Sequence, residues 1–290
     1  MTAFNGAPIV VGVDGSDRGL AAVEAAAAEA ALRHRPLHIV HALVWVPAGV
    51  STSLPVHRFS YEQGEKFVTE AVALAARCAP QVAVTCEVVP GGPAIVLLDA
   101  SRRASLLVIG DRSLNNGLAE LVIDPVALRL ATHGTCPVLV IRGDARADGP
   151  VVVGVDGSPD SVEALAFAAE EADLRGAEMV ALHAWDRANH TELNDNLPMT
   201  SEFWSDGDEE RRVLAESLAG LAEKYPDLRI SRQVRHGSAR RLLGDWSRSA
   251  QLVVVGTRGH RGLTSVVLGS VGRHLVHHAA CPTAVVRHRG

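Results

Sequence analysis

Short apolar runs alternate with longer stretches of helical periodicity throughout the chain. In the N-terminal half, the Ala-rich stretch from Ser16 to Arg33 predicts the first helix. A strand that regularly precedes a helix is typical of a parallel sheet whose two faces are covered by helices, so the pattern predicts an α/β fold. In the C-terminal half the same pattern predicts strands near 150–155, 177–184, 228–235, 251–256 and 282–287, and helices near 159–175, 207–225, 238–249 and 270–279.

This pattern occurs twice. Two copies of about 140 residues have the size of ordinary domains, so we predict domains at 1–143 and 151–290 with a linker at 144–150. Looser stretches follow the second strand of each copy, at 45–60 and 186–206, and are expected to be mobile loops. The matching segments are 9–16 with 151–158 and His41-Ala42 with His183-Ala184, both 142 positions apart, and Cys136-Pro137 with Cys281-Pro282, 145 positions apart.

Composition limits the classes of partner. The formal charge of −5 and a pI near 6.2 argue against general binding to nucleic acid or to an anionic membrane. No apolar run is long enough to span a bilayer, and no charged segment precedes an apolar one at the N-terminus, so we expect a cytoplasmic protein. The four cysteines form no Cys-x-x-Cys pair, which gives no support for a redox or metal role.

The strongest chemical signal is a glycine loop in the second copy. Gly256-Thr257-Arg258-Gly259 follows the apolar run 252–255, and Gly269-Ser270 opens the next predicted helix. Glycine lets a backbone approach an anion closely, because it has no Cβ. The first turn of a helix adds unpaired N–H groups and the positive end of the helix dipole. The spacing therefore predicts a phosphate site at the carboxyl edge of the sheet.

Together, the strand-Asp-Gly-Ser openings, the His-Ala pairs, the Gly-x-x-Gly-x9-Gly-Ser loop and the Cys-Pro pairs resemble the universal stress proteins in their tandem form. The resemblance covers almost the whole chain. It implies two doubly wound domains, each a five-stranded parallel sheet in the order 3-2-1-4-5 with helices on both faces. It also implies ATP held between the first strand and the glycine loop, pairing of the domains through their last strands, and a homodimer.

Carried over by position, the resemblance divides the site into two parts. One part would border the adenine and ribose, and the other would hold the phosphates. The first set is Gly154, Val155, Asp156 and Ala184, and the second is Gly256, Gly259, Gly269 and Ser270.

The first copy departs from the loop motif. Ser113 stands where the second copy has Gly259, and Asp124-Pro125 stands where it has Gly269-Ser270. An Asp at an N-cap followed by proline at the first helical position is a strong helix start, and its carboxylate occupies the place of a phosphate. We therefore predict one competent ATP site per chain, in the second domain.

Some polar residues have two interpretations. Arg258, His260 and Arg261 are either solvated loop residues or contacts to phosphate. Asp14 and Asp156 either cap the following helix or touch a ligand; we favour the cap for Asp14 and the ligand for Asp156.

The histidines favour structural roles. We favour such roles for His41 and His183, which repeat at strand ends. His274, His277 and His278 share helical spacing, but no carboxylate or cysteine motif completes a metal site.

Two function classes remain. The chain lacks a Walker lysine motif and kinase motifs, which favours an ATP-binding regulator or sensor, and no catalytic residue is assigned. The competing class is a slow ATPase or a nucleotidyl- or phosphoryl-transfer enzyme that uses the same site. A dinucleotide oxidoreductase is disfavoured because Asp-Gly-Ser replaces Gly-x-Gly-x-x-Gly after the first strand. ATP with or without Mg²⁺, ADP, AMP and a cyclic nucleotide all remain open as ligands.

Overall fold

The computed structural model describes residues 6–44, 61–111, 125–144, 146–185, 206–259 and 267–288. The chain divides into two compact units, Met1–Arg142 and Gly143–Gly290, which are described separately. The loop predicted at 45–60 and all but the last residue of that at 186–206 lie outside the described residues. The same is true of Ser113, Asp124, His260 and Arg261.

The first unit is a parallel sheet in the order β3-β2-β1-β4-β5. Helix α1 packs on α2, and α3 packs on α4. Because the strand order reverses after β3, right-handed crossovers place these two helix pairs on opposite faces. The elements, in chain order, are β1 (Ile9–Val13), α1 (Asp17–Leu32), β2 (Leu37–Leu43), α2 (Tyr61–Cys78), β3 (Val84–Pro90), α3 (Pro93–Ser101), β4 (Leu106–Gly110), α4 (Pro125–His133) and β5 (Val138–Ile141).

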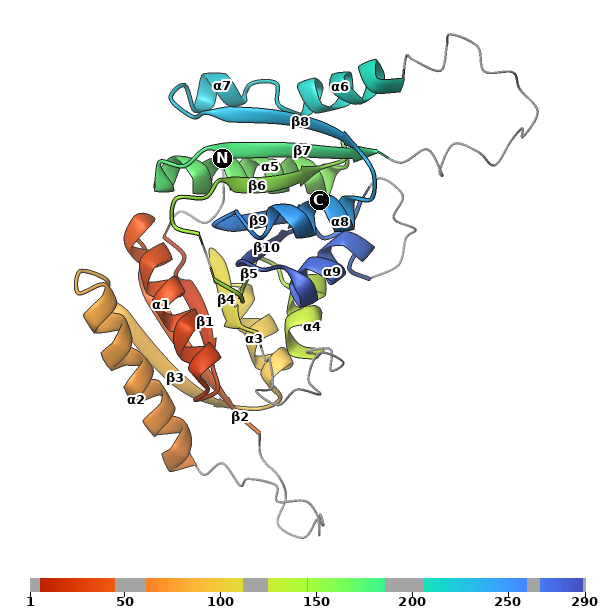
Figure 1. Ribbon diagram of the computed structural model, residues 1–290. Helices are drawn as coiled ribbons and strands as arrows, with labels where there is room; N and C mark the ends of the chain where they lie inside the picture. Colours follow the sequence, from red (N-terminus) through yellow and green to blue (C-terminus); the bar gives the residue numbers. More distant parts are fainter. Residues whose placement is uncertain are drawn as a thin grey trace. The chain divides into compact units, whose positions relative to one another are not determined.

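The second unit repeats this topology in the order β8-β7-β6-β9-β10, again with parallel pairing (Figure 1). The predicted fold, with its 3-2-1-4-5 order in both copies, is therefore confirmed. The elements are β6 (Val151–Val155), α5 (Pro159–Arg175), β7 (Met179–Trp185), α6 (Asp206–Ser217), α7 (Leu221–Lys224), β8 (Ile230–His236), α8 (Ala239–Trp246), β9 (Leu252–Gly256), α9 (Ser270–His278) and β10 (Thr283–Val286).

The sheets form the cores of both units. The central strands β1, β4, β6 and β9 are buried except at their glycines, because helices cover both faces. Alanines on α1 and α5 pack against these strands and allow close approach of helix and sheet. No helix in the described ranges has the length and apolarity needed to cross a bilayer.

One predicted helix is wrong. The stretch 207–225 is two helices, because α6 ends at Ser217 and α7 begins at Leu221. Gly220 lies between them with φ of +80°, a left-handed conformation that ends a helix. Glycine was the sequence signal for this break, and the apolar periodicity on both sides concealed it.

Candidate functional site

A cavity of about 420 Å³ opens at the carboxyl ends of β6, β7 and β9. This is the usual position of a ligand in an open α/β sheet, at the point where the strand order reverses. The loop after β9 and the first turn of α9 form one wall, and α8 contributes Ala239 and Leu243. All nine residues singled out from the sequence line this cavity, namely Gly154, Val155, Asp156, Ala184, Gly256, Arg258, Gly259, Gly269 and Ser270.

The β6–α5 turn presents Asp156 to the cavity. Its Oδ1 accepts hydrogen bonds from the Ser158 backbone N–H (3.0 Å) and from the Ser158 hydroxyl (2.6 Å). The Ser158 Oγ accepts from the Ser161 N–H at 3.2 Å and so caps α5. Gly157 supplies the positive φ, +77°, that the turn requires. The aspartate therefore shapes the turn, while the serine after it is the helix cap.

The first unit contains the same turn. Ser16 caps α1 through the Gly19 N–H (3.1 Å), and the carboxylate of Asp14 accepts from the Ser16 hydroxyl at 2.6 Å. The interpretation of Asp14 as the helix cap is thus wrong. An aspartate two residues before the cap serine forms an Asx-turn, which the sequence pattern alone did not separate from a cap.

Close approach requires one glycine of the loop, Gly256, and brings a second, Gly259, against a side chain. A Cβ on Gly256 would lie 2.9 Å from backbone and side-chain atoms of Asp160. A Cβ on Gly259 would lie 2.5 Å from Oδ2 of Asp156. The glycine loop therefore lies directly against the β6–α5 turn, and both form the wall of one cavity.

The N-terminus of α9 is open toward this cavity. Gly269 is its N-cap and has no side chain, and no other side chain in the described part of the chain caps the helix. The first intrahelical bond runs from the Arg273 N–H to the Gly269 carbonyl at 2.9 Å. The preceding residues of the first turn, 270–272, line the cavity. Their N–H groups and the helix dipole favour an anion there.

Asp160 is a site residue that sequence reasoning missed. Only 4% of it is exposed, and its Oδ2 accepts from the Thr257 hydroxyl, from the Arg258 N–H (3.0 Å) and from the Arg258 Nε–H (3.3 Å). Its Oδ1 accepts from the His288 N–H at 3.0 Å. Burial raises the pKa of Asp160, but the bonds from Thr257 and His288 and the charge of Arg258 outweigh burial and hold that pKa below its usual value.

The missed signal was a swap between the copies. Arg18 occupies in the first copy the position that Asp160 occupies in the second, 142 residues later. Likewise, Asp111 follows β4 where Thr257 follows β9. The first copy therefore has a basic residue where the second has an acidic one, and this difference in sequence indicated a difference in the chemistry of the two sites.

The two repeated histidines join strands. The Nδ1 of His183 lies 2.7 Å from the Val155 carbonyl, and its Nε2 contacts Glu210 of α6. The Nδ1 of His41 lies 2.8 Å from the Val13 carbonyl. Both rings therefore bond to the neighbouring strand, in line with the structural role favoured from the sequence.

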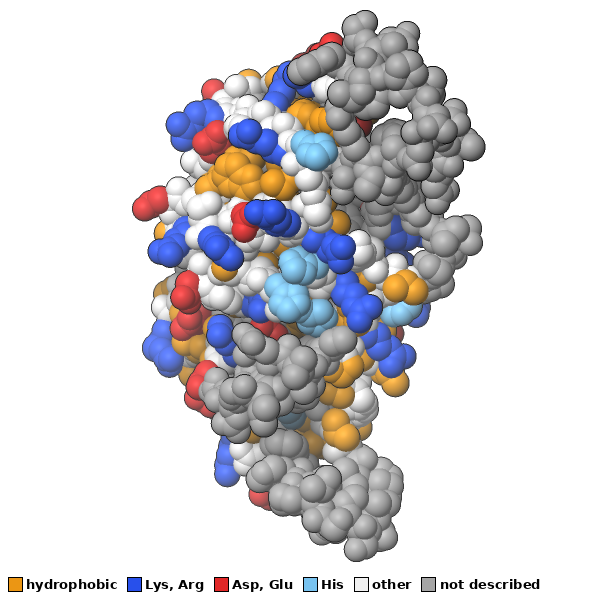
Figure 2. Space-filling view, turned by 45° about the vertical axis from the view of Figure 1, so that its right-hand side comes forward, with side chains coloured by type: hydrophobic (Ala, Val, Ile, Leu, Met, Phe, Trp, Pro, Cys, Tyr) orange, Lys and Arg blue, Asp and Glu red, His pale blue; other side chains and the backbone are white. Residues whose placement is uncertain are grey.

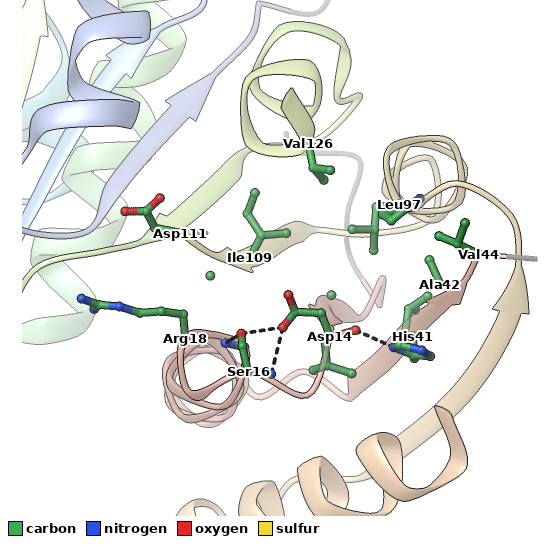
Figure 3. Close-up of a pocket in the computed structure, with 16 residues that line it drawn as sticks. Asp14, Ser16, Arg18, His41, Ala42, Val44, Leu97, Ile109, Asp111 and Val126 are labelled. Atoms are coloured by element: carbon green, nitrogen blue, oxygen red, sulfur yellow. Dashed lines mark hydrogen bonds between the residues drawn. The ribbon is translucent and has the colours of Figure 1, made fainter. Parts of the chain in front are cut away.

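The corresponding cavity of the first unit is smaller, about 120 Å³. Figure 3 shows Arg18 and Asp111 at one end, His41 at the other, and Asp14 between them. Arg142 lies 3.6 Å from Asp111. Proline is the first residue of α4, as predicted. This cavity therefore has an acidic and a basic side chain where the second has a glycine loop.

No group of three histidine, cysteine or acidic side chains in the described ranges is arranged to hold a metal. His274 and His278 lie side by side on α9, with ring centroids 4.8 Å apart. The cysteines before the last strand of each unit, Cys136 and Cys281, are buried.

Comparison with known proteins agrees with this architecture. A universal stress protein of Mycolicibacterium smegmatis is 35% identical over 296 residues, 97% of each chain, and one of Mycobacterium tuberculosis is 37% identical over 96% of each chain. The crystal structure of a universal stress protein from Archaeoglobus fulgidus shares the fold, with a TM-score of 0.73 over 99% of this chain and 100% of that one, at 16% identity. The model of the universal stress protein family matches residues 7–142 and again 149–287. The chain therefore belongs to the universal stress protein family and contains two of its domains in tandem.

Proposed function

We propose that this protein binds ATP in the cavity of its second unit and acts as a nucleotide-dependent regulator or sensor in the stress response. The observation that carries the proposal is that the N-terminus of α9, which has no side-chain cap, lies against the glycine loop and lines the same cavity. Backbone N–H groups and a helix dipole that converge on one space form an anion site that needs no lysine. The arrangement suits the phosphates of a nucleotide.

The rest of the cavity suits a nucleoside. Gly154 and Ala184 lie at the ends of β6 and β7, where small residues leave room for a flat base. Val155 and Leu243 add apolar surface, and the Asp156 carboxylate, which also lines the cavity, would accept hydrogen bonds from ribose hydroxyls. Arg258, with its side chain about half exposed, lies beside the phosphate end.

We further propose one such site per chain. The cavity of the first unit has less than a third of the volume, about 120 Å³ against 420 Å³. Asp111 introduces a carboxylate at the end of β4, where phosphate would approach. The small volume, together with this carboxylate in the place of Thr257, makes the first domain, proposed at 1–143, a poor ATP site.

The surroundings of Asp160 favour a regulatory role over ATP turnover. Asp160, the carboxylate bonded to the phosphate loop, is buried and accepts four hydrogen bonds. Its lowered pKa makes it a poor proton acceptor. The competing function, slow ATP hydrolysis or group transfer at the same site, predicts steady turnover that Ser270→Ala abolishes.

The test is calorimetric titration of ATP into nucleotide-stripped protein, beside the variant Gly269→Asp. The backbone of Gly269, with φ of −57° and ψ of 155°, has a conformation that any residue adopts, and a Cβ there would lie 3.3 Å from the Thr257 carbonyl oxygen, so the loop must shift slightly to accept it. An aspartate there caps α9 with a carboxylate and removes the anion site, so we expect one ATP per wild-type chain and loss of binding in the variant.

The matched control is Ser249→Asp, which adds the same charge at an exposed turn of the same unit. It should bind ATP like the wild type. Two equivalent sites per wild-type chain would contradict the single-site proposal. No binding at all would leave the glycine loop as a helix-opening turn and would end the nucleotide proposal.

A further inference from the structure

The net charge of −5 conceals a strong asymmetry along the sequence. Residues 228–290 contain eleven arginines, no lysine, and Asp245 as their single acidic residue. The preceding 227 residues contain 17 basic and 32 acidic residues. The formal charges of the two segments are therefore +10 and −15. The net charge of the whole chain therefore does not describe the surface that residues 228–290 form.

This basic segment folds into β8, α8, β9, α9 and β10. The strands β9 and β10 are buried, so the charge lies mainly on β8 and on the outer sides of the two helices. In the described part of the segment, the exposed arginines on and near these elements are Arg229, Arg232 and Arg235 before and along β8, Arg240, Arg241 and Arg248 in and after α8, Arg258 after β9, and Arg273 in α9.

The two helices bring part of this charge together. The Nε2 of His274 on α9 lies 3.6 Å from the position of a Cβ on Gly244 of α8, so the helices pack at that point. Arg240 stands four residues before Gly244 on α8 and so shares its side of the helix, and the exposed Arg248 follows in the turn after the helix ends at Trp246. We call this surface the α8–α9 face and define it by Arg240, Arg248, Arg273, His274, His277 and His278.

The α8–α9 face is accessible and basic. Figure 2, the view that brings α8 and α9 forward, shows a group of histidines with arginine or lysine side chains around it. His278 lies against both His274 (4.8 Å between ring centroids) and His277 (6.3 Å). None of the six residues that define the face lines the cavity, which α8 and α9 border with others such as Leu243 and Gly272. The face is therefore separate from the proposed nucleotide site.

Three guanidinium groups on the face have no acidic partner among the described residues. Asp245 pairs with Arg241 at 3.9 Å, which leaves Arg240, Arg248 and Arg273 without an ion pair there. Guanidinium groups form paired hydrogen bonds with carboxylates, so such a surface is complementary to an acidic one.

We propose that the α8–α9 face docks a short protein segment rich in Asp and Glu. Helices of eight and nine residues are about 12 to 14 Å long, which matches a short segment rather than an extended polyanion. A nucleic acid long enough to pass beyond the face would meet the net negative charge of the remaining surface. These two observations favour an acidic peptide over nucleic acid.

The experiment measures fluorescence anisotropy of a labelled oligoglutamate peptide with the full-length, nucleotide-free protein. The test variant carries R240E, R248E and R273E. The matched control carries R229E, R232E and R235E on β8, with the same change of charge in the same unit. We expect the test variant to weaken binding at least about tenfold and the control to change it less than about threefold.

If charge reversal impairs folding, a milder variant with Arg→Gln at the same three face positions replaces it. This variant should also weaken peptide binding. Equal losses in the test and control variants would show that binding follows net charge, and would overturn the proposal. Absence of peptide binding by the wild type would do the same. Tighter binding of a duplex DNA, lost in the test variant, would assign the face to nucleic acid instead. Omission of nucleotide keeps every outcome independent of the proposed ATP site.

Discussion

At the scale of single residues, the two domains differ most at one position. Asp160 joins the glycine loop, through Thr257 and Arg258, to the segment after β10, through His288. Arg18 takes its place in the first domain and lines that domain's cavity. A buried, charged acceptor therefore holds the second domain's loop, and the first domain lacks it at this position.

Replacement of Asp160 by Asn should destabilise the second unit by about 2 kcal/mol at neutral pH, because the amide gives up the charge that four donors satisfy. The folded-state pKa is lowered, so the stabilisation is complete above the unfolded value of about 3.9 and is lost as pH falls through the folded value. Urea unfolding of the wild type and the variant at several pH values measures this difference in the free energy of unfolding.

The difference between wild type and variant should shrink below about pH 4, where the wild-type carboxyl also becomes protonated. Asp173→Asn, an exposed aspartate on the same helix, is the control and should have little effect. A difference that is constant across the acid range would show that the charge of Asp160 contributes nothing.

At the scale of elements, the sequence predicted the strands of the second unit, all of its helices except the divided one, and the first helix of the first unit, because periodicity and the repeated motifs agree. The nine residues that it singled out, from the glycine spacing and from the family resemblance, are among those that line the cavity. It did not predict Asp160, whose partners lie 97 to 128 residues away, because no local pattern reports such contacts. The break at Gly220 was missed because one left-handed residue leaves the apolar pattern unchanged.

Gly220→Ala tests that break. Its φ of +80° is unfavourable for any residue with a Cβ, so we expect a loss of about 1 kcal/mol although the space around it is open. Thermal unfolding measures the change. Gly207→Ala on α6, at a position without positive φ, is the control and should be neutral or slightly stabilising. An unchanged melting temperature for Gly220→Ala would show that the α6–α7 break is adaptable.

At the scale of the whole molecule, the duplication has produced two domains of one fold with different chemistry. The first has a small cavity with Arg18 and Asp111, and the second has a glycine loop, an open helix end and an arginine-rich outer face. Duplication leaves each copy free to change while the other keeps its site. The proposed single nucleotide site and the proposed acidic-segment site both belong to the second unit.

Saturating ATP should therefore protect only one half of the chain from hydrogen exchange. Ligand binding stabilises the unit that holds the ligand, so slower exchange is expected at residues 151–156, 252–259 and 267–278 and unchanged exchange across β1 and β4. Mass spectrometry of peptides from both units measures this directly, and Gly269→Asp should show no protection. Equal protection of both units would contradict the proposed asymmetry.

The bonds of Asp160 also bear on the timing of synthesis. The carboxylate is made at the start of α5, but the donor N–H of His288 lies 128 residues further along the chain. At ordinary rates of translation that interval is roughly 6 to 25 s. During it, the first unit has all of its strands, whereas the glycine loop is made only 97 residues after Asp160 and the His288 donor comes last. Ligand capture at that cavity is therefore expected to begin only after β10 has been made and joined its sheet.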